Sequence, residues 1–173
     1  MKKYLYLFIL LFSFSSITAQ NPLEKFEFLI GNWQGVESGV AGDGIGFRTY
    51  NWELGQNFIF VKNQSTFPKT EKKPMGEVHR DIGVFSYNPN TEKYILREFH
   101  VENFVNIYEL DTEQSSGDKL VFLTREIENN PGNWKAKLIL TKTGEDKFTE
   151  EFLIATNGKD FKPFLKNEWT KVK

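Results

Sequence analysis

Cysteine is absent from all 173 residues of this chain. Its absence excludes disulfide bonds, zinc sites built from thiolates and catalysis by a thiol. Histidine is scarce too, with only His79 and His100. No glycine-rich phosphate loop, no Ser–His–Asp order and no His–carboxylate spacing typical of a metal site stands out. The sequence therefore predicts no catalytic residue and no metal ligand.

Long blocks of like charge are also missing. Lys and Glu are interspersed along the chain, and without Lys2 and Lys3 there are 20 basic residues against 23 acidic ones, a net charge of −3. Such a surface attracts neither nucleic acid nor an anionic membrane. We therefore expect no nucleic-acid partner.

The one long apolar run lies at the start of the chain. Lys2 and Lys3 precede an apolar stretch over 4–14, and a small, polar segment follows up to Gln20. This is the layout of a signal peptide, and the run is too short to span a bilayer comfortably. We expect residues 1–20 to be a signal peptide cleaved after Ala19 or Gln20; an uncleaved N-terminal anchor is the alternative. Residues 21–173 would then form one exported domain, periplasmic or secreted, with no membrane span.

Helical periodicity is absent after residue 30, where short strand-like segments alternate with turn-forming residues. Before them, Asn21 and Pro22 suit the N-cap and first position of one or two helical turns. The expected strands cover 32–38, 46–54, 57–66, 81–88, 93–101, 104–111, 119–127, 134–143, 146–155 and 162–172. Regular short strands at this spacing predict an all-β antiparallel sandwich or barrel.

Alternation within the strands gives each one an apolar and a polar face. Trp134, Ala136 and Leu138 share one face, while Lys135 and Lys137 lie on the other. The same period places three residues of the second strand on one face: Arg48, Tyr50 and Trp52. A closed sheet with an apolar interior requires this pattern, although a sandwich produces it as well.

The segment Gly31-Asn32-Trp33 favours the barrel. A Gly-x-Trp that follows a short apolar lead-in and precedes about ten strands resembles the calycin superfamily, which includes lipocalins, fatty-acid-binding proteins and nitrobindin-like haem barrels. The resemblance implies a single antiparallel barrel of about ten strands, with Gly31 turning the chain and Trp33 across the barrel base. It also implies that a basic residue of the last strand packs on that Trp, a role for which this chain offers only Lys.

Within the superfamily, ten strands and the short first link over 38–45 most resemble nitrobindin-like domains. Those domains ligate haem iron through a His near the C-terminus, and this chain has no His after residue 100. The haem ligand of the family therefore has no counterpart here, and we expect no cofactor.

The hairpin around residues 97–108 suggests which side chains face the cavity. If Glu102 and Asn103 form a two-residue turn, Arg97 pairs with Tyr108 and Phe99 with Asn106. The face containing Arg97, Phe99 and Tyr108 is the more apolar one, so we expect it to line the interior and His100 to point outward. An inward His100 is the alternative, because a shift of one residue reverses the faces.

We therefore expect a lipocalin-like barrel that binds a small hydrophobic molecule with a carboxylate or other polar head. Arg97, Arg125 and Tyr108 would hold the head, and Trp52, Phe99 and Trp134 would pack the tail. Arg125 alternates with apolar residues and needs a carboxylate partner, from the ligand or from Glu37 or Glu150.

Three other functions stay open. One is a haem barrel with unusual ligation through His79, His100 or a Tyr. Another is an isomerase or cyclase that uses a Tyr or Glu inside the cavity. The last is an interaction module whose interior is filled by its own side chains, since 14 of the 17 Phe and all four Trp follow residue 20.

Overall fold

The computed structural model describes residues 20–40, 42–71, 74–130 and 132–173. The expected signal peptide, 1–20, lies outside the described residues except for Gln20. Within the described part of the chain, no helix is long and apolar enough to cross a membrane.

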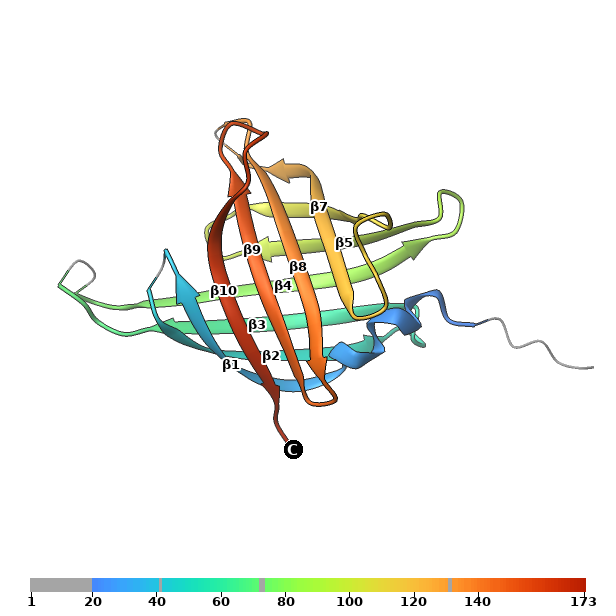
Figure 1. Cartoon of the computed structure of the whole chain (residues 1–173), viewed down its shortest axis with the longest axis horizontal. Helices are drawn as coiled ribbons and strands as arrows, with labels where there is room; N and C mark the ends of the chain where they lie inside the picture. The colour runs from blue at the N-terminus through green and yellow to red at the C-terminus, as the bar shows by residue number, and fades with distance from the viewer. Residues whose placement is uncertain (1–19, 41, 72–73, 131) are drawn as a thin grey trace, which may run out of the picture.

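Ten antiparallel strands form one closed barrel (Figure 1). Each strand pairs with its neighbours in the sequence, and the last strand closes the sheet on the first. The strands are β1 (Gly31–Gly39), β2 (Gly44–Glu53), β3 (Phe58–Phe67), β4 (Glu77–Asn88), β5 (Lys93–His100), β6 (Val105–Leu110), β7 (Lys119–Glu128), β8 (Lys135–Gly144), β9 (Lys147–Ala155) and β10 (Lys162–Lys171). The all-β, ten-stranded barrel expected from the sequence is confirmed.

A short 3-10 helix, η1 (Pro22–Leu29), precedes the barrel and covers one of its ends. The Asn21 side chain accepts a hydrogen bond from the Leu23 backbone N–H at 2.9 Å, which satisfies a free donor of the first turn. Its amide also donates to the Gln56 carbonyl in the β2–β3 turn at 3.0 Å. Leu23, Phe26 and Leu29 are buried, so the helix seals this end with apolar side chains.

The barrel half beside η1 is filled by aromatic rings. Phe26 packs against Phe85 and Phe122, with ring centroids 5.3 and 6.0 Å apart. The indole N–H of Trp33 donates to the Leu29 carbonyl at 2.6 Å, and its ring meets Phe148 edge-on at 4.7 Å. Edge-to-face geometry of this kind is the favoured arrangement of paired rings. These side chains thus pack the base of the barrel against η1.

Lys171 of β10 occupies the position expected of a basic residue beside the base Trp. Its Nζ lies 5.4 Å from the centroid of the Trp33 ring, within reach of a cation–π interaction. Gly31, at φ +128°, leaves space for that side chain, because a Cβ at this position would lie 2.7 Å from Lys171 Cε. Glycine thus meets both the backbone and the packing requirement at the start of β1.

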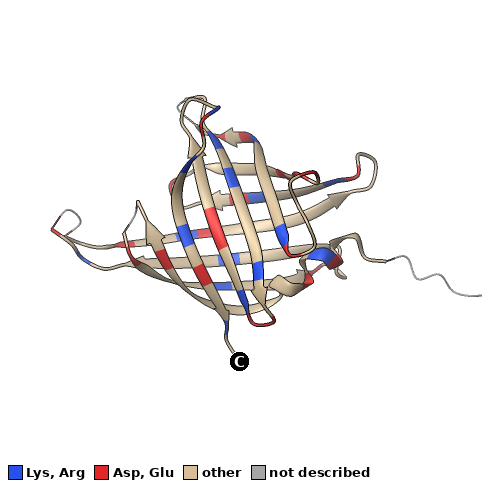
Figure 2. Ribbon diagram, viewed as in Figure 1, with Lys and Arg blue, Asp and Glu red and all other residues tan. Residues whose placement is uncertain are grey.

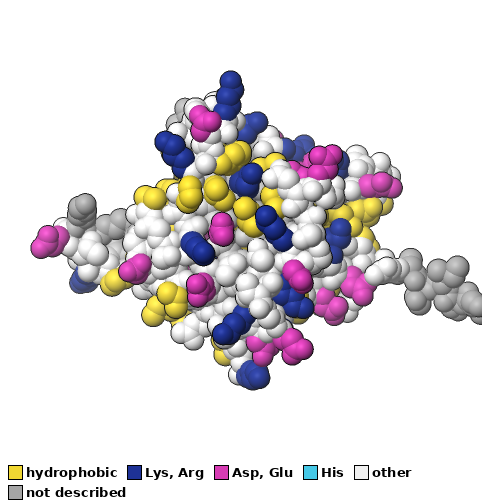
Figure 3. All heavy atoms as spheres, in the orientation of Figure 1, with side chains coloured by type: hydrophobic (Ala, Val, Ile, Leu, Met, Phe, Trp, Pro, Cys, Tyr) yellow, Lys and Arg dark blue, Asp and Glu magenta, His cyan; other side chains and the backbone are white. Residues whose placement is uncertain are grey.

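The outer wall carries charges of both signs. Lys and Arg are interspersed with Asp and Glu along the strands (Figure 2). Hydrophobic side chains reach the surface between them over the upper half of the same view (Figure 3).

The β5–β6 turn differs from the expected one. His100 donates its backbone N–H to the Phe104 carbonyl at 3.0 Å, and Asn103 adopts φ +71°. The turn therefore contains three residues, 101–103, and Phe99 pairs with Val105 while Arg97 pairs with Ile107. The expected pairs Arg97–Tyr108 and Phe99–Asn106 are wrong. Because side chains alternate, this shift of one residue turns Arg97 and Phe99 outward and His100 inward.

Candidate functional site

The half of the barrel away from η1 encloses a cavity of about 610 Å³. Val40, Glu77, Glu102, Asn130 and Ile154 line it near the strand ends that surround its mouth. The volume lies within the ordinary range of small-molecule sites, roughly 300–1,000 Å³. The interior is thus packed at one end and hollow at the other.

One wall of the cavity is apolar and comes from the C-terminal half of the chain. Trp134 stands at the mouth, 39% exposed, just before β8. The other apolar lining residues of β7 to β10 are Ile127, Ala136, Leu138, Phe152, Ile154, Phe164 and Leu165. Except for Phe164, which lies at the irregularity between β9 and β10, they face inward because each occupies the apolar position of its strand's alternation.

The floor of the cavity is an ion pair between two strands that β1 and β10 separate in the barrel. Arg48 of β2 donates through its guanidinium to the Glu150 carboxylate of β9, and their side chains are only 10% and 7% exposed. Arg48 Nε also donates to Asn63 Oδ1 at 3.0 Å, and Asn167 Nδ2 donates to Glu150 Oε1 at 3.2 Å. Burial opposes the charge of Arg48, but the interactions with Glu150, Tyr50 and Asp81 together outweigh it and raise the Arg48 pKa. The cation at the floor is therefore already neutralised.

A second carboxylate lies beside this pair. Glu37 of β1 is 2% exposed and accepts a hydrogen bond from Ser65 Oγ at 2.6 Å. Burial raises the pKa of Glu37, although the Ser65 hydroxyl and the Arg48 charge act in the opposite direction. This group therefore holds its proton to a higher pH than an exposed Glu.

Closer to the mouth, His79 stands between two carboxylates. Its Nε2 is 3.3 Å from Asp81 Oδ2 and its Nδ1 is 2.8 Å from Glu102 Oε1. The hydrogen bond to Asp81, followed by the one to Glu102, raises the pKa of His79 to about 9 against the opposing effect of burial. Burial opposes ionisation of Asp81 as well, but His79 and Arg48 outweigh it and hold the Asp81 pKa below its usual range. At neutral pH the pair is an imidazolium and a carboxylate.

Glu98 and His100 of β5 face the same cavity in uncharged form. Burial, assisted by the charge of Asp81, raises the pKa of Glu98 to about 8, while burial lowers that of His100. Asn106 Nδ2 lies 3.0 Å from His100 Nε2 and donates to the Tyr108 hydroxyl at 3.1 Å. The Glu98 carboxyl has no hydrogen-bond partner among the described residues, so it is available to a ligand.

Of the six residues expected to bind a ligand, only Trp134 lines the cavity. Tyr108 is fully buried beneath Asn106, and Trp52 is half-buried against the core. Phe99 is 43% exposed on the outer wall. The remaining two, Arg97 and Arg125, require a correction of their own.

Arg97 and Arg125 are exposed, so their expected inward orientation is wrong. They lie together in a shallow depression on the outer wall, where Arg97 Nη1 donates to Ser86 Oγ at 3.2 Å. Arg97 turned outward with the register of β5, and Arg125 lies next to the irregularity between β6 and β7, where Glu126 pairs with Ile107 but Thr124 with Tyr108. The inward carboxylate expected for Arg125, Glu150, instead pairs with Arg48.

Several residues of the site were missed from the sequence. Arg48 could have been found, because it shares the inward face of its strand with Tyr50. The positions of His79 and Asp81 depend on the pairing of β3 with β4 across a long loop, for which no local signal exists.

Comparisons with known proteins show a fold but no family. No protein-family model matches the chain, and no curated protein matches it. Among solved structures, the chain is similar to Rv2717c from M. tuberculosis, with a TM-score of 0.61, 14% identity, and coverage of 89% of this chain and 99% of that one. It is also similar to the S-type phycobiliprotein lyase CPES from Guillardia theta, with a TM-score of 0.51, 11% identity, and coverage of 89% and 94%. These likenesses show a shared antiparallel barrel fold.

Proposed function

We propose that this protein binds a small, mostly apolar molecule in the open half of its barrel. The supporting observation is the division of the cavity into two walls. The apolar side chains of β7 to β10 suit a hydrophobic body, and Glu98, His100 and Asn106 opposite them suit one polar end. The fold shared with a phycobiliprotein lyase is compatible with a small-molecule site.

The polar end of the ligand is better matched as a hydrogen-bond donor, neutral or cationic, than as a carboxylate. The arginine that borders the cavity, Arg48, is already paired with Glu150. Five other carboxyl groups line the same space, those of Glu37, Glu77, Asp81, Glu98 and Glu102. A carboxylate head beside them would find Arg48 and His79 already paired with carboxylates, which leaves Lys135 at the start of β8 as the unpaired cation of the lining among the described residues. An amine, amide or hydroxyl would find several acceptors.

A matched pair of substitutions on β9 tests the cavity. Ile154 lines it and Leu153, the preceding residue, does not, so Trp at each position adds a bulky ring to opposite faces of the strand. Titration with a fluorescent long-chain amine should show at least a tenfold loss of affinity in Ile154→Trp and a change below about twofold in Leu153→Trp. The same probe with a carboxylate head should bind more weakly to the wild type.

Two results would contradict the proposal. Equal affinity of the amine probe for both variants would show that it binds outside the barrel. Tighter binding of the carboxylate probe would contradict the proposed head group. Native mass spectrometry of protein purified from its own host would identify a co-purifying molecule directly, and a visible absorption spectrum would reveal haem if the alternative reading is right.

We also infer export from the N-terminal sequence. The layout of Lys2, Lys3 and the apolar run supports cleavage after Ala19 or Gln20. The intact mass of the protein from its host gives the cleavage position, and an uncleaved chain would contradict the inference.

A further inference from the structure

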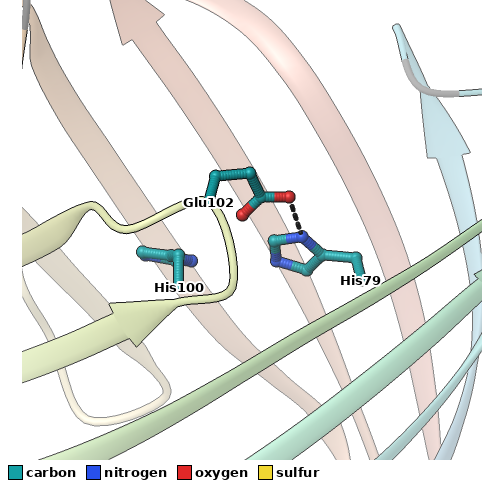
Figure 4. A group of neighbouring side chains, drawn as sticks. All are labelled: His79, His100 and Glu102. Atoms are coloured by element: carbon teal, nitrogen blue, oxygen red, sulfur yellow. Dashed lines mark hydrogen bonds and ion pairs between the residues drawn. The ribbon is translucent and has the colours of Figure 1, made fainter.

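Two histidines and a glutamate meet at the mouth of the cavity. His79 lies in β4, His100 ends β5, and Glu102 belongs to the turn that follows (Figure 4). One ligand atom from each of the three lies within 4.8 Å of the others. The two rings are 5.8 Å apart between centroids, and Figure 4 shows Glu102 reaching over toward the space between them. Three separate segments thus direct metal-binding atoms at one point.

The separations suit a tetrahedral ion after a small adjustment. Zinc bonds of about 2.0–2.2 Å to nitrogen and oxygen place neighbouring ligand atoms about 3.3 Å apart. His79 Nδ1 and Glu102 Oε1 are already 2.8 Å apart. Glu102 stands on a turn with its side chain 43% exposed, so it can move without disturbing the barrel. Rotation of the Glu102 side chain can therefore adjust its distance to both histidines while the strands stay in place.

Neighbouring side chains hold each imidazole by the nitrogen that a metal would not use. Asp81 Oδ2 lies 3.3 Å from His79 Nε2, and Asn106 lies 3.0 Å from His100 Nε2. In each ring this leaves Nδ1 for a metal. Carboxylate and amide partners of this kind orient ligating histidines in metal sites. When His100 Nε2 carries the proton, a reversed Asn106 amide accepts it through Oδ1, and the Tyr108 hydroxyl donates to the same oxygen.

We propose that His79, His100 and Glu102 bind a divalent transition-metal ion of the Zn²⁺ class, with the fourth position open to the cavity. Two imidazoles and one carboxylate favour zinc and its neighbours over Mg²⁺ or Ca²⁺, which prefer cages of oxygen. The open position would accept a nitrogen or oxygen atom from a molecule in the cavity. The metal site depends only on these three side chains and does not rest on the proposed apolar ligand.

Calorimetric titration of tag-free protein with Zn²⁺ at neutral pH tests the site. We expect one ion per chain. His79→Ala and His100→Ala each remove a ligand and should weaken binding by at least about 100-fold, and Asp81→Asn, which removes an orienting partner, by about 10–100-fold. Glu168→Gln, an exposed carboxylate on the outer face of β10, serves as the matched control and should change nothing. Circular dichroism establishes that each variant retains its sheet.

Because the chain has only two histidines, the imidazole signals in a nitrogen-edited NMR spectrum assign the ligands directly. Both rings should shift with one equivalent of Zn²⁺. Undetectable binding, or binding that survives both His→Ala changes, would overturn the proposal. The fluorescent amine, titrated after chelator treatment, separates the two hypotheses: binding of that probe without zinc binding overturns only the metal site, and the reverse overturns only the apolar ligand.

Discussion

The two ends of the barrel are built from the same strands but have opposite interiors. Beside η1, Phe26, Phe85 and Phe122 contact one another and Trp33 closes the base. At the other end the same sheet surrounds about 610 Å³ of space lined on one side by charged and amide groups. The closed end buries apolar rings, whose removal from water stabilises the fold. The open end carries the buried ionisable groups, which the proposed binding site would use.

The boundary between the ends is the Arg48–Glu150 pair. Below it, Tyr50 accepts from Arg48 Nη1 at 3.2 Å and packs toward Phe85 and Phe148. Above it, Asn63 continues the hydrogen bonds to Asp81 at 3.0 Å. A bound molecule would therefore rest on a fixed polar floor, while the aromatic half keeps the barrel closed beneath it.

The largest effect should come from removing a ring at the closed end. Phe122→Ala deletes a fully buried side chain and should lower the free energy of unfolding by about 3–5 kcal/mol. Phe152→Ala makes the same change at the open end, where the ring is only partly buried and borders the cavity, so we expect less than half that loss. Urea unfolding followed by Trp fluorescence compares them, and equal losses would contradict the division into a packed and a hollow half.

Breaking the Arg48–Glu150 pair should lower the free energy of unfolding by slightly less than Phe122→Ala does. Arg48→Met leaves the Glu150 carboxylate buried without its cation, and we expect a loss of about 3 kcal/mol, the low part of the range for such pairs, because both groups border the cavity. Adding Glu150→Gln removes the orphan charge and should recover at least half of the loss. A double variant as unstable as the single one would show that packing of Arg48 on the Trp169 ring, 4.3 Å away, matters more than its charge.

The sequence predicts the fold well because each signal is local. Strand alternation, turn residues and the Asn21-Pro22 start of η1 act within a few residues, and all ten strands occur near their expected positions. Gly31 and Trp33 place the base of the barrel, and Lys171 meets Trp33 as expected of the last strand. Closure of the sheet by pairing β1 with β10 does not follow from the local signals, which fit a sandwich as well; it was expected from the resemblance carried by Gly31 and Trp33.

The site is predicted less well because its residues depend on register. The turn between β5 and β6 contains three residues instead of the expected two. Glu98 and His100 therefore lie on the inner face, where Arg97 and Phe99 were expected. The sequence does not distinguish these turns, because Asn103 tolerates the left-handed conformation in either one. The metal-binding group of His79, His100 and Glu102 was missed for the same reason.

A smaller effect should appear in the pH dependence of stability. Burial raises the pKa of Glu37 above its value in the unfolded chain. Its contribution to stability is therefore complete below the unfolded pKa, about 4.3, and is lost as the pH rises through the folded pKa. Glu37→Gln keeps an acceptor for Ser65 without the titration, so its stability relative to wild type should increase over that interval. Urea titrations from pH 4 to pH 7 measure the difference, and parallel curves for the two proteins would contradict the raised pKa.

The smallest effect should come from Arg97 and Arg125. Both side chains lie on the outer wall, separated from the cavity by the sheet itself, so neither can touch a molecule inside the barrel. Arg97→Gln and Arg125→Gln should leave the affinity for the fluorescent amine within about twofold of wild type, as exposed substitutions far from a site usually do. A tenfold loss in Arg125→Gln would mean that β7 is inverted at that position, and a tenfold loss in Arg97→Gln would mean that β5 is inverted relative to this register. In that case Arg97 would face the interior, and Glu98 and His100 would no longer form part of the polar wall of the cavity.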